Sequence, residues 1–319
     1  MPGPVDHEVP LFDVHAHFSP PTSPAHRRAV WERARRERFL APEPFEWRLA
    51  DTLAFMDETG TAVQMLSNVP ADLDALRASN DFGAEVVAEH PSRFGLLAAL
   101  PTGDPDAAVA ELDRVRDADG WAVTTVHNGR SLADAALDPL WRRLDERRAV
   151  VFVHPNAYAP AVADLPRPLV EVAFDTGRTV VGMLYAGVFD RFPGITFVLA
   201  HAGGALPVLA GRLSLLGAEP WVPNPGRLGR DDIAAALRRL WVDTAASASD
   251  QQLAAAVHTV GADHVVHGSD WGVPCTDRES AVRGIDALDR SRVLSAPTRA
   301  AVRARARVLF PAAAARAQR

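Results

Sequence analysis

Phe12-Asp13-Val14-His15-Ala16-His17 has the alternation of apolar and polar side chains that is typical of a β-strand. Successive side chains of a strand point to opposite faces, so His15 and His17 project from the same face. Two imidazoles on one side of a rigid strand are half of the ligand set of a typical zinc site. A His-x-His pair alone is weak evidence for a metal, so other strand ends must supply the remaining ligands.

Three further apolar runs end in a residue of this kind, at His154, His201 and Asp270. Divalent ions such as zinc accept imidazole nitrogen and carboxylate oxygen, and catalytic sites leave one position open. His15, His17, His154 and Asp270 would supply three nitrogens and one oxygen. His201 would lie beside them and move protons, because histidine has an unperturbed pKa of ~6.5. The ordinary alternatives are histidines bonded within the core and an aspartate that caps a helix or turn.

Apolar runs of strand length alternate with helical patterns along the whole chain. Eight strands are predicted, over residues 11–16, 62–67, 94–100, 122–126, 150–154, 195–201, 240–243 and 265–269. The clearest helices are predicted over residues 71–90, 106–118, 134–148, 169–192, 231–239 and 249–260. Eight such repeats indicate a (β/α)₈ TIM barrel, in which the active site gathers at the carboxyl ends of the strands. The proposed ligands all lie at such ends.

The pattern predicts a single domain over residues 8–311. Residues 18–48 form a long insertion after the first strand, rich in proline, arginine and aromatic residues, which we expect to be a lid or an interface arm. Residues 312–319 form an Ala- and Arg-rich tail that we expect to be disordered.

Charge and composition narrow the class of protein. The chain has 319 residues and a net charge of −6, which argues against nucleic acid or an anionic membrane as the main partner. No apolar run approaches the ~20 residues that span a bilayer. The N-terminus lacks the basic start and apolar stretch of a signal peptide. The single cysteine, Cys275, excludes an intramolecular disulfide, and a cytoplasmic location is expected.

All 34 basic residues are arginines, because the chain has no lysine. A Schiff-base lysine, a phosphate-loop lysine and a carboxylated lysine that bridges two metals are therefore all excluded. This composition favours a site with one metal ion.

Four motifs resemble those of the amidohydrolase-related family typified by aminocarboxymuconate-semialdehyde decarboxylase, which also includes γ-resorcylate and methylsalicylate decarboxylases. They are Asp13–Phe18, Val153–Pro155, His201–Pro207 and Gly268–Trp271. The resemblance extends from about Leu11 to Phe310. It implies one divalent metal, Zn²⁺ or alternatively Mn²⁺, held by the four proposed ligands, and His201 and Asp270 as the catalytic residues.

The resemblance also implies a homodimer. In the family prototype an arginine after the His-x-Gly-Gly motif reaches into the neighbouring subunit and binds a substrate carboxylate, and Arg212 has the matching position. A helix-surface arginine is the alternative. The prototype has a second such arginine four residues before a loop tryptophan, but this chain has Glu43 four residues before Trp47, and an acid there would repel a carboxylate. Trp271, Phe18 and Trp47 could form an apolar wall against a substrate ring.

Three functions remain open at this stage. The first is a metal-dependent, non-oxidative decarboxylase that acts on an aromatic or enoic carboxylic acid of small size. The second is a metal-dependent hydrolase or hydratase, similar to a lactonase, that uses a metal-bound hydroxide on the same site. The third is a barrel without catalytic activity, which would be expected to have a damaged ligand set.

Overall fold

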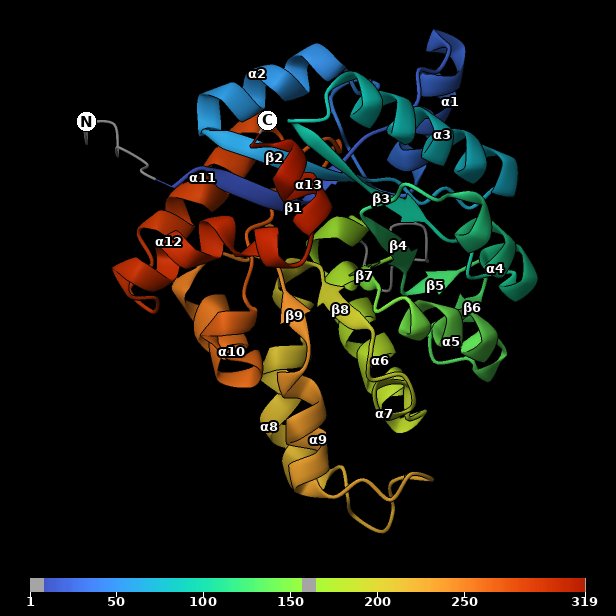
Figure 1. The fold of residues 1–319 in the computed structure, drawn as a ribbon, viewed down its shortest axis with the longest axis vertical. Coiled ribbons are helices and arrows are strands. Elements are labelled where there is room, and N and C mark those ends of the chain that lie inside the picture. Colours follow the sequence, from blue (N-terminus) through green and yellow to red (C-terminus); the bar gives the residue numbers. More distant parts are fainter. Residues whose placement is uncertain (1–8, 157–164, 319) are drawn as a thin grey trace.

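A curled parallel sheet surrounded by helices forms the protein in a computed structural model that describes residues 9–156 and 165–318 (Figure 1). Seven strands are hydrogen-bonded in chain order, and every neighbouring pair is parallel. They are β1 (Leu11–His17), β2 (Thr61–Ser67), β3 (Phe94–Ala99), β4 (Gly120–Thr124), β7 (Val150–His154), β8 (Thr196–Leu199) and β9 (Trp241–Val242). A short antiparallel pair, β5 (Val126–His127) and β6 (Arg130–Ser131), follows β4.

The eighth predicted strand, residues 265–269, closes the sheet without forming a regular strand of its own. Isolated bridges join Val265 to β9 and Trp271 to β1. The buried carboxylate of Asp13 accepts hydrogen bonds from the backbone N–H of Ser269 at 3.0 Å and from its hydroxyl at 2.5 Å. This side-chain clamp replaces part of the backbone ladder between the first and last barrel segments. The predicted (β/α)₈ barrel is thereby confirmed.

Helices cover the outside of the sheet close to the predicted positions. They are α1 (Pro24–Arg36), α2 (Leu49–Thr59), α3 (Leu73–Glu89), α4 (Pro105–Arg114), α5 (Asp138–Glu146), α6 (Glu171–Tyr185), α7 (Val188–Arg191), α8 (Leu206–Leu216), α9 (Arg230–Arg238), α10 (Asp250–Val260), α11 (Arg278–Asp289), α12 (Ala296–Ala304) and α13 (Pro311–Arg316). Short 3₁₀ turns include Arg167–Leu169 and His201–Gly203. The segment between α8 and α9 projects from the lower end of the molecule in Figure 1.

The insertion over residues 18–48 is partly helical. Ser23 caps α1, since its hydroxyl accepts a hydrogen bond from the N–H of His26 at 3.2 Å, and Pro24 occupies the first helical position. None of the residues of α1 is fully buried. The helix therefore lies over the barrel as a surface element and can border a cavity without being part of the core.

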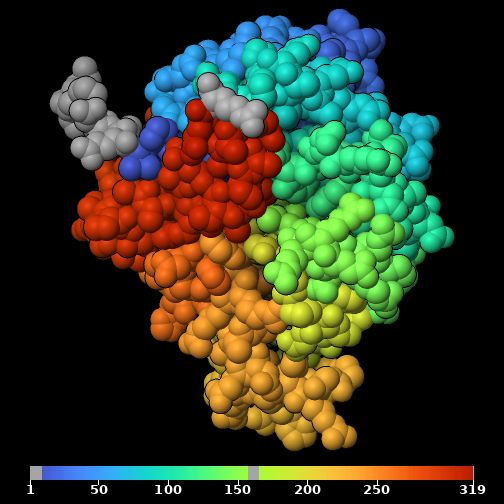
Figure 2. Space-filling view, in the orientation of Figure 1, coloured from blue at the N-terminus to red at the C-terminus, as the bar shows by residue number. Residues whose placement is uncertain are grey.

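The prediction of a disordered tail is wrong for the residues that the structure describes. Residues Pro311–Arg316 form α13, and Ala313 is buried. Phe310 stacks on Phe12 of β1 with ring centroids 6.4 Å apart, and both belong to a buried cluster inside the barrel. In the space-filling view the C-terminal segment covers the strands that lie behind it (Figure 2). Residues 8 and 319, the outer limits of the expected domain and tail, lie outside the described residues.

Two apolar layers hold the barrel together. The larger layer lies between the sheet and the helices, with Trp141 and Phe197 among its members. The smaller layer fills the barrel, with Phe12 and Phe152 among its members. Within residues 9–156 and 165–318, no helix has the length and apolar character needed to cross a membrane.

Candidate active site

The first strand presents two histidines to the barrel mouth through a local irregularity. Asp13 pairs with Gln64 of β2 and Ala16 pairs with Leu66, so β1 has one residue more than β2 in this interval. Such bulges change the direction of side chains and are frequent near active sites. The Nε2 atoms of His15 and His17 lie 3.0 Å apart. The prediction that these two side chains share a face is confirmed.

Four side chains from three barrel segments converge at this point. Asp270 Oδ1 lies 3.1 Å from His15 Nε2 and 3.2 Å from His17 Nε2. With one nitrogen of His154, the four potential ligand atoms all lie within 4.8 Å of one another. Such spacing suits side chains around one ion bound at about 2.0–2.2 Å. The four residues proposed from the sequence are thus brought together as a candidate metal centre.

The other nitrogens of two of these histidines have partners that leave Nε2 available to a metal. His154 Nδ1 lies 2.8 Å from the carbonyl oxygen of Pro155, and a carbonyl only accepts, so Nδ1 carries the proton. His154 Nε2 is buried without a hydrogen-bond partner among the described residues. His15 Nδ1 lies 2.7 Å from Asp243 Oδ2. A buried, unpartnered imidazole nitrogen that faces a carboxylate is the arrangement a divalent ion would satisfy.

Asp243 was not singled out from the sequence. Its Oδ1 accepts hydrogen bonds from the backbone N–H groups of His201 and Ala245, at 2.8 and 3.0 Å, while Oδ2 contacts His15. The carboxylate is fully buried. The available signal was its position at the end of the predicted strand 240–243, the same position that identified the other ligands.

Burial and charge set the protonation of the cluster. Burial and the neighbouring imidazoles lower the pKa of His154 well below its usual value, so this ring is neutral, as a metal ligand must be. Burial alone would lower the pKa of His15, but Asp243 and Asp270 raise it to about 10. Burial would raise the pKa of Asp270, but its contacts with His15 and the other histidines bring it well below the usual range. Two buried carboxylates therefore favour a positive charge at this point.

His201 lies beside the cluster and outside the group of four ligands. Its Nε2 is 3.7 Å from Asp270 Oδ2, and its Nδ1 is buried without a partner among the described residues. His201 and Asp270 both have positive φ angles, of 57° and 61°. Such angles are uncommon for residues other than glycine and concentrate at functional sites. At Gly204 (φ 60°) an added Cβ would lie 2.3 Å from the carbonyl oxygen of Ala173, so the turn after His201 requires glycine.

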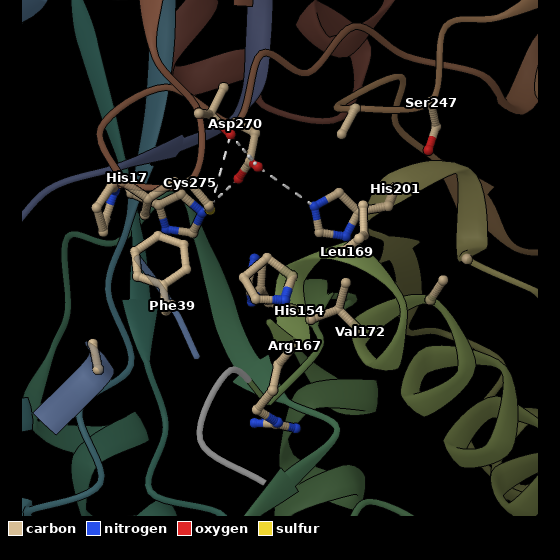
Figure 3. Close-up of a pocket in the computed structure, with 18 of the residues that line it drawn as sticks. His17, Phe39, His154, Arg167, Leu169, Val172, His201, Ser247, Asp270 and Cys275 are labelled. Atoms are coloured by element: carbon tan, nitrogen blue, oxygen red, sulfur yellow. Dashed lines mark hydrogen bonds and ion pairs between the residues drawn. The ribbon is translucent and has the colours of Figure 1, made fainter. Parts of the chain in front are cut away.

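A cavity of about 440 Å³ extends from this cluster (Figure 3). His17, His154, His201 and Asp270 line it at the metal centre, and Cys275 is exposed beside them. Much of the remaining wall is apolar and comes from the insertion and from the segment around α6. These residues include Val30, Phe39, Pro168, Leu169, Val172 and Ala173. The charged side chains on the wall are Arg33, Glu37 and Arg167. A pocket of this size and character suits a small aromatic molecule.

The three aromatic residues predicted to contact a substrate ring do not line this cavity. Trp271 stacks on Phe55, with ring centroids 4.2 Å apart, and its indole N–H donates to Thr52 Oγ1 at 3.2 Å. Phe18 and Trp47 are buried and pack edge to face, with centroids 6.2 Å apart. Each of these side chains packs against another aromatic ring, and their contact with a substrate stays a prediction. Phe39 supplies an aromatic wall to the cavity.

The predicted arginine and its acidic counterpart also lie away from the cavity of this chain. Arg212 is exposed on α8 and is not among the lining residues. Glu43 borders a neighbouring surface hollow together with Trp47 and Trp271. Arg33 and Arg167, which the sequence did not single out, line the cavity.

The curled parallel sheet and the His/Asp cluster at its strand ends define a class of metal-dependent barrel enzymes. The amidohydrolase family model matches residues 12–309, and the chain belongs to this family.

Named relatives of the chain are decarboxylases. The chain is 31% identical over 293 residues to decarboxylase macB of Penicillium terrestre, covering 81% of this chain and 83% of that one. It is 28% identical over 283 residues to 6-methylsalicylic acid decarboxylase of Penicillium expansum, covering 81% and 84%. The fold is similar to that of dihydroxybenzoic acid decarboxylase from Polaromonas sp. with bound manganese and the inhibitor 2-nitroresorcinol. That match has a TM-score of 0.75 and 22% identity, and covers 95% of this chain and 97% of that one.

Proposed function

We propose that the protein is a metal-dependent, non-oxidative decarboxylase of a small aromatic carboxylic acid. The observation that carries this proposal is the convergence of four potential metal ligands and His201 at one end of a largely apolar cavity. The relatives support it, because one of them is named for an aromatic acid, 6-methylsalicylic acid. A hydrolase or hydratase reaction at the same site is the alternative, and the test below distinguishes it from decarboxylation.

His15, His17, His154 and Asp270 would hold the ion. A divalent ion supplies a positive charge that can hold the substrate carboxylate or a neighbouring hydroxyl. Three imidazoles and one carboxylate suit Zn²⁺. Mn²⁺ is the alternative ion, because the Polaromonas enzyme of similar fold has bound manganese.

His201 and Asp270 would handle the proton. Decarboxylation requires a proton at the ring carbon that bears the carboxylate, after which the bond to the carboxylate breaks, its electron pair returns to the ring and CO₂ leaves. His201 borders the cavity and its Nε2 faces Asp270, while its Nδ1 has no hydrogen-bond partner among the described residues. This pair can deliver the proton and recover one from solvent. Phe39, Leu169 and Val172 would hold the ring and exclude water.

The test is CO₂ release from a panel of hydroxybenzoates by the metal-loaded protein. We expect CO₂ release to stop when a chelator removes the metal and to resume when Zn²⁺ or Mn²⁺ is added. His201→Asn should lower the rate by about 10²–10⁴-fold and keep its metal. The exposed His258→Asn is the control and should be fully active. Full activity without metal, or hydrolysis of lactones without CO₂ release, would overturn the proposal.

We also propose that the protein acts as a homodimer in the cytoplasm. The exposed apolar side chains of α8 and of the segment that follows it support a dimer. The single cysteine, Cys275, suits a reducing compartment.

A further inference from the structure

Arg167 is a buried arginine on the cavity wall, and two of its three guanidinium nitrogens lack a hydrogen-bond partner among the described residues. It begins the 3₁₀ turn Arg167–Leu169 between β7 and α6. The residue is 6% exposed, and its Nε and Nη1 atoms are buried without a hydrogen-bond partner among the described residues. Buried arginines are normally paired, because an uncompensated buried charge is strongly destabilising. An arginine left in this state on a cavity wall is therefore a candidate for binding a ligand.

Nearby carboxylates keep this guanidinium charged, although no described residue forms a hydrogen bond to its Nε or Nη1. Burial lowers the pKa of Arg167 from its usual value, while the charges of Asp175, Glu171 and Glu37 act in the opposite direction. Asp175 Oδ2 accepts hydrogen bonds from the hydroxyl of Thr125 and from a backbone N–H, so this oxygen is engaged elsewhere. Arg167 remains a cation, and its Nε and Nη1 donors, which no described residue engages, are available to an anionic oxygen.

Arg167 and the metal centre lie at different parts of the same cavity. His154 lies between the guanidinium and Asp270 in the close-up view (Figure 3). Leu169 and Val172 line the apolar wall near them. A ligand that fills the cavity would therefore contact the candidate metal centre, the apolar side chains of Leu169 and Val172, and Arg167.

We propose that Arg167 determines substrate specificity by binding a second carboxylate, carried by the aromatic acid at a position remote from its reacting carboxylate. This inference rests on the proposed function, because it assumes that the reacting carboxylate lies at the metal centre. Arg167 is distinct from Arg212, which is exposed on α8 and does not line the cavity of its own chain.

The test compares the binding of two benzenedicarboxylates, with carboxylates at positions 1,3 and 1,4, with that of benzoate. Calorimetry on the Zn²⁺-loaded protein should show that at least one dicarboxylate binds about tenfold or more tightly than benzoate, as expected for hydrogen bonds to a charged donor. Arg167→Gln should remove this preference and leave benzoate binding unchanged, and Arg167→Lys should keep part of it. Arg33→Gln is the matched control, an exposed arginine on the same wall, and should keep the full preference.

Thermal unfolding separates this role from a structural one. Gln removes the desolvation cost of the buried guanidinium together with its attraction to the nearby carboxylates, so the unfolding temperature of Arg167→Gln should stay close to that of the wild type. If Arg167→Gln does not fold, the role is structural and the proposal is wrong. Equal binding of all three acids by the wild type, or an equal loss of benzoate and dicarboxylate binding in the variant, would also overturn it. A retained preference without CO₂ release from any acid would instead contradict the proposed reaction and leave the role of Arg167 intact.

Discussion

Asp243 acts at the scale of one residue by fixing the orientation of a metal ligand. Its carboxylate lies 2.7 Å from His15 Nδ1 and also accepts the backbone N–H of His201. We expect Asp243→Asn to weaken metal binding by about 10–100-fold, because the amide cannot hold the Nδ1 proton as the carboxylate does. Competition with a chelator of known affinity measures this loss. Asp263→Asn, at an exposed surface position, should bind metal as the wild type does, and equal affinities in the two variants would contradict the role of Asp243.

A second effect at the scale of one residue is that His267 lowers the stability of the folded protein in acid. Burial and the charge of Arg303 lower the pKa of His267 to about 3. An unfolded histidine titrates near ~6.5, so below this pH the unfolded chain binds a proton that the native protein does not. The free energy of unfolding therefore falls by about 1.4 kcal/mol for each pH unit between these two values.

Replacing His267 tests this linkage. Between pH 6.5 and 4.5 we expect the wild type to lose about 2 kcal/mol more stability than His267→Gln, measured by urea unfolding at each pH. The exposed His258→Gln should follow the wild-type profile. Parallel profiles for wild type and His267→Gln would show that His267 does not contribute.

At the scale of elements, an ion pair between Arg316 and Asp119 connects the C-terminal helix to the barrel. Arg316 donates two hydrogen bonds to Asp119, at 3.0 and 2.7 Å, and Asp119 also accepts the N–H of Leu96 in β3. Asp119 is almost fully buried, while Arg316 is 26% exposed. We expect Arg316→Ala to lower the free energy of unfolding by about 1.5–3 kcal/mol, because it leaves a buried carboxylate partly unpaired. Urea unfolding measures the change, and a loss as large in the exposed Arg307→Ala would contradict this explanation.

The regular elements were predictable where local signals specify them. The strand Val150–His154 was predicted at its observed bounds, and α10 begins directly after Ser249, whose hydroxyl accepts from the N–H of Gln252. The last barrel segment, residues 265–269, has the same apolar pattern but no regular ladder. Its closure depends on the contact between Asp13 and Ser269, which no local pattern encodes. Helix α1 was not predicted because it has no buried face and therefore no apolar stripe.

The candidate site, too, was predictable from the sequence only in part. The period of a strand and the topology of a barrel were sufficient to predict that His15, His17, His154 and Asp270 converge. Arg167 could not be found in this way, because its burial and the lack of a described partner for its Nε and Nη1 are properties of the packed molecule. The aromatic residues Phe18 and Trp271 follow the metal motifs directly in sequence, but packing directs them away from the cavity.

At the scale of the whole molecule, α8 presents an apolar surface that one chain leaves exposed. Val208 is 78% exposed and Leu215 is 59% exposed, and Arg212 lies between them at helical spacing on the same side. Trp221, in the segment after α8, is 69% exposed. Exposed apolar side chains grouped in this way are typical of a protein interface. The proposed homodimer would bury them and could bring Arg212 to the cavity of the other subunit.

Mixing two inactive variants tests whether each active site uses Arg212 of the other subunit. His15→Ala should lack metal, and Arg212→Ala should lose affinity for the acid if the arginine acts across the interface. In a mixed dimer, one site combines both defects and the other is intact. Random exchange of equal amounts should therefore restore about a quarter of the wild-type activity in a symmetric dimer. Light scattering confirms the dimer, and Val208→Asp, which places a charge in the interface, should abolish both dimer and recovery. If Arg212 acts within its own chain or only on the surface, the mixture shows no gain over the sum of its parts, because no subunit then depends on its partner's arginine.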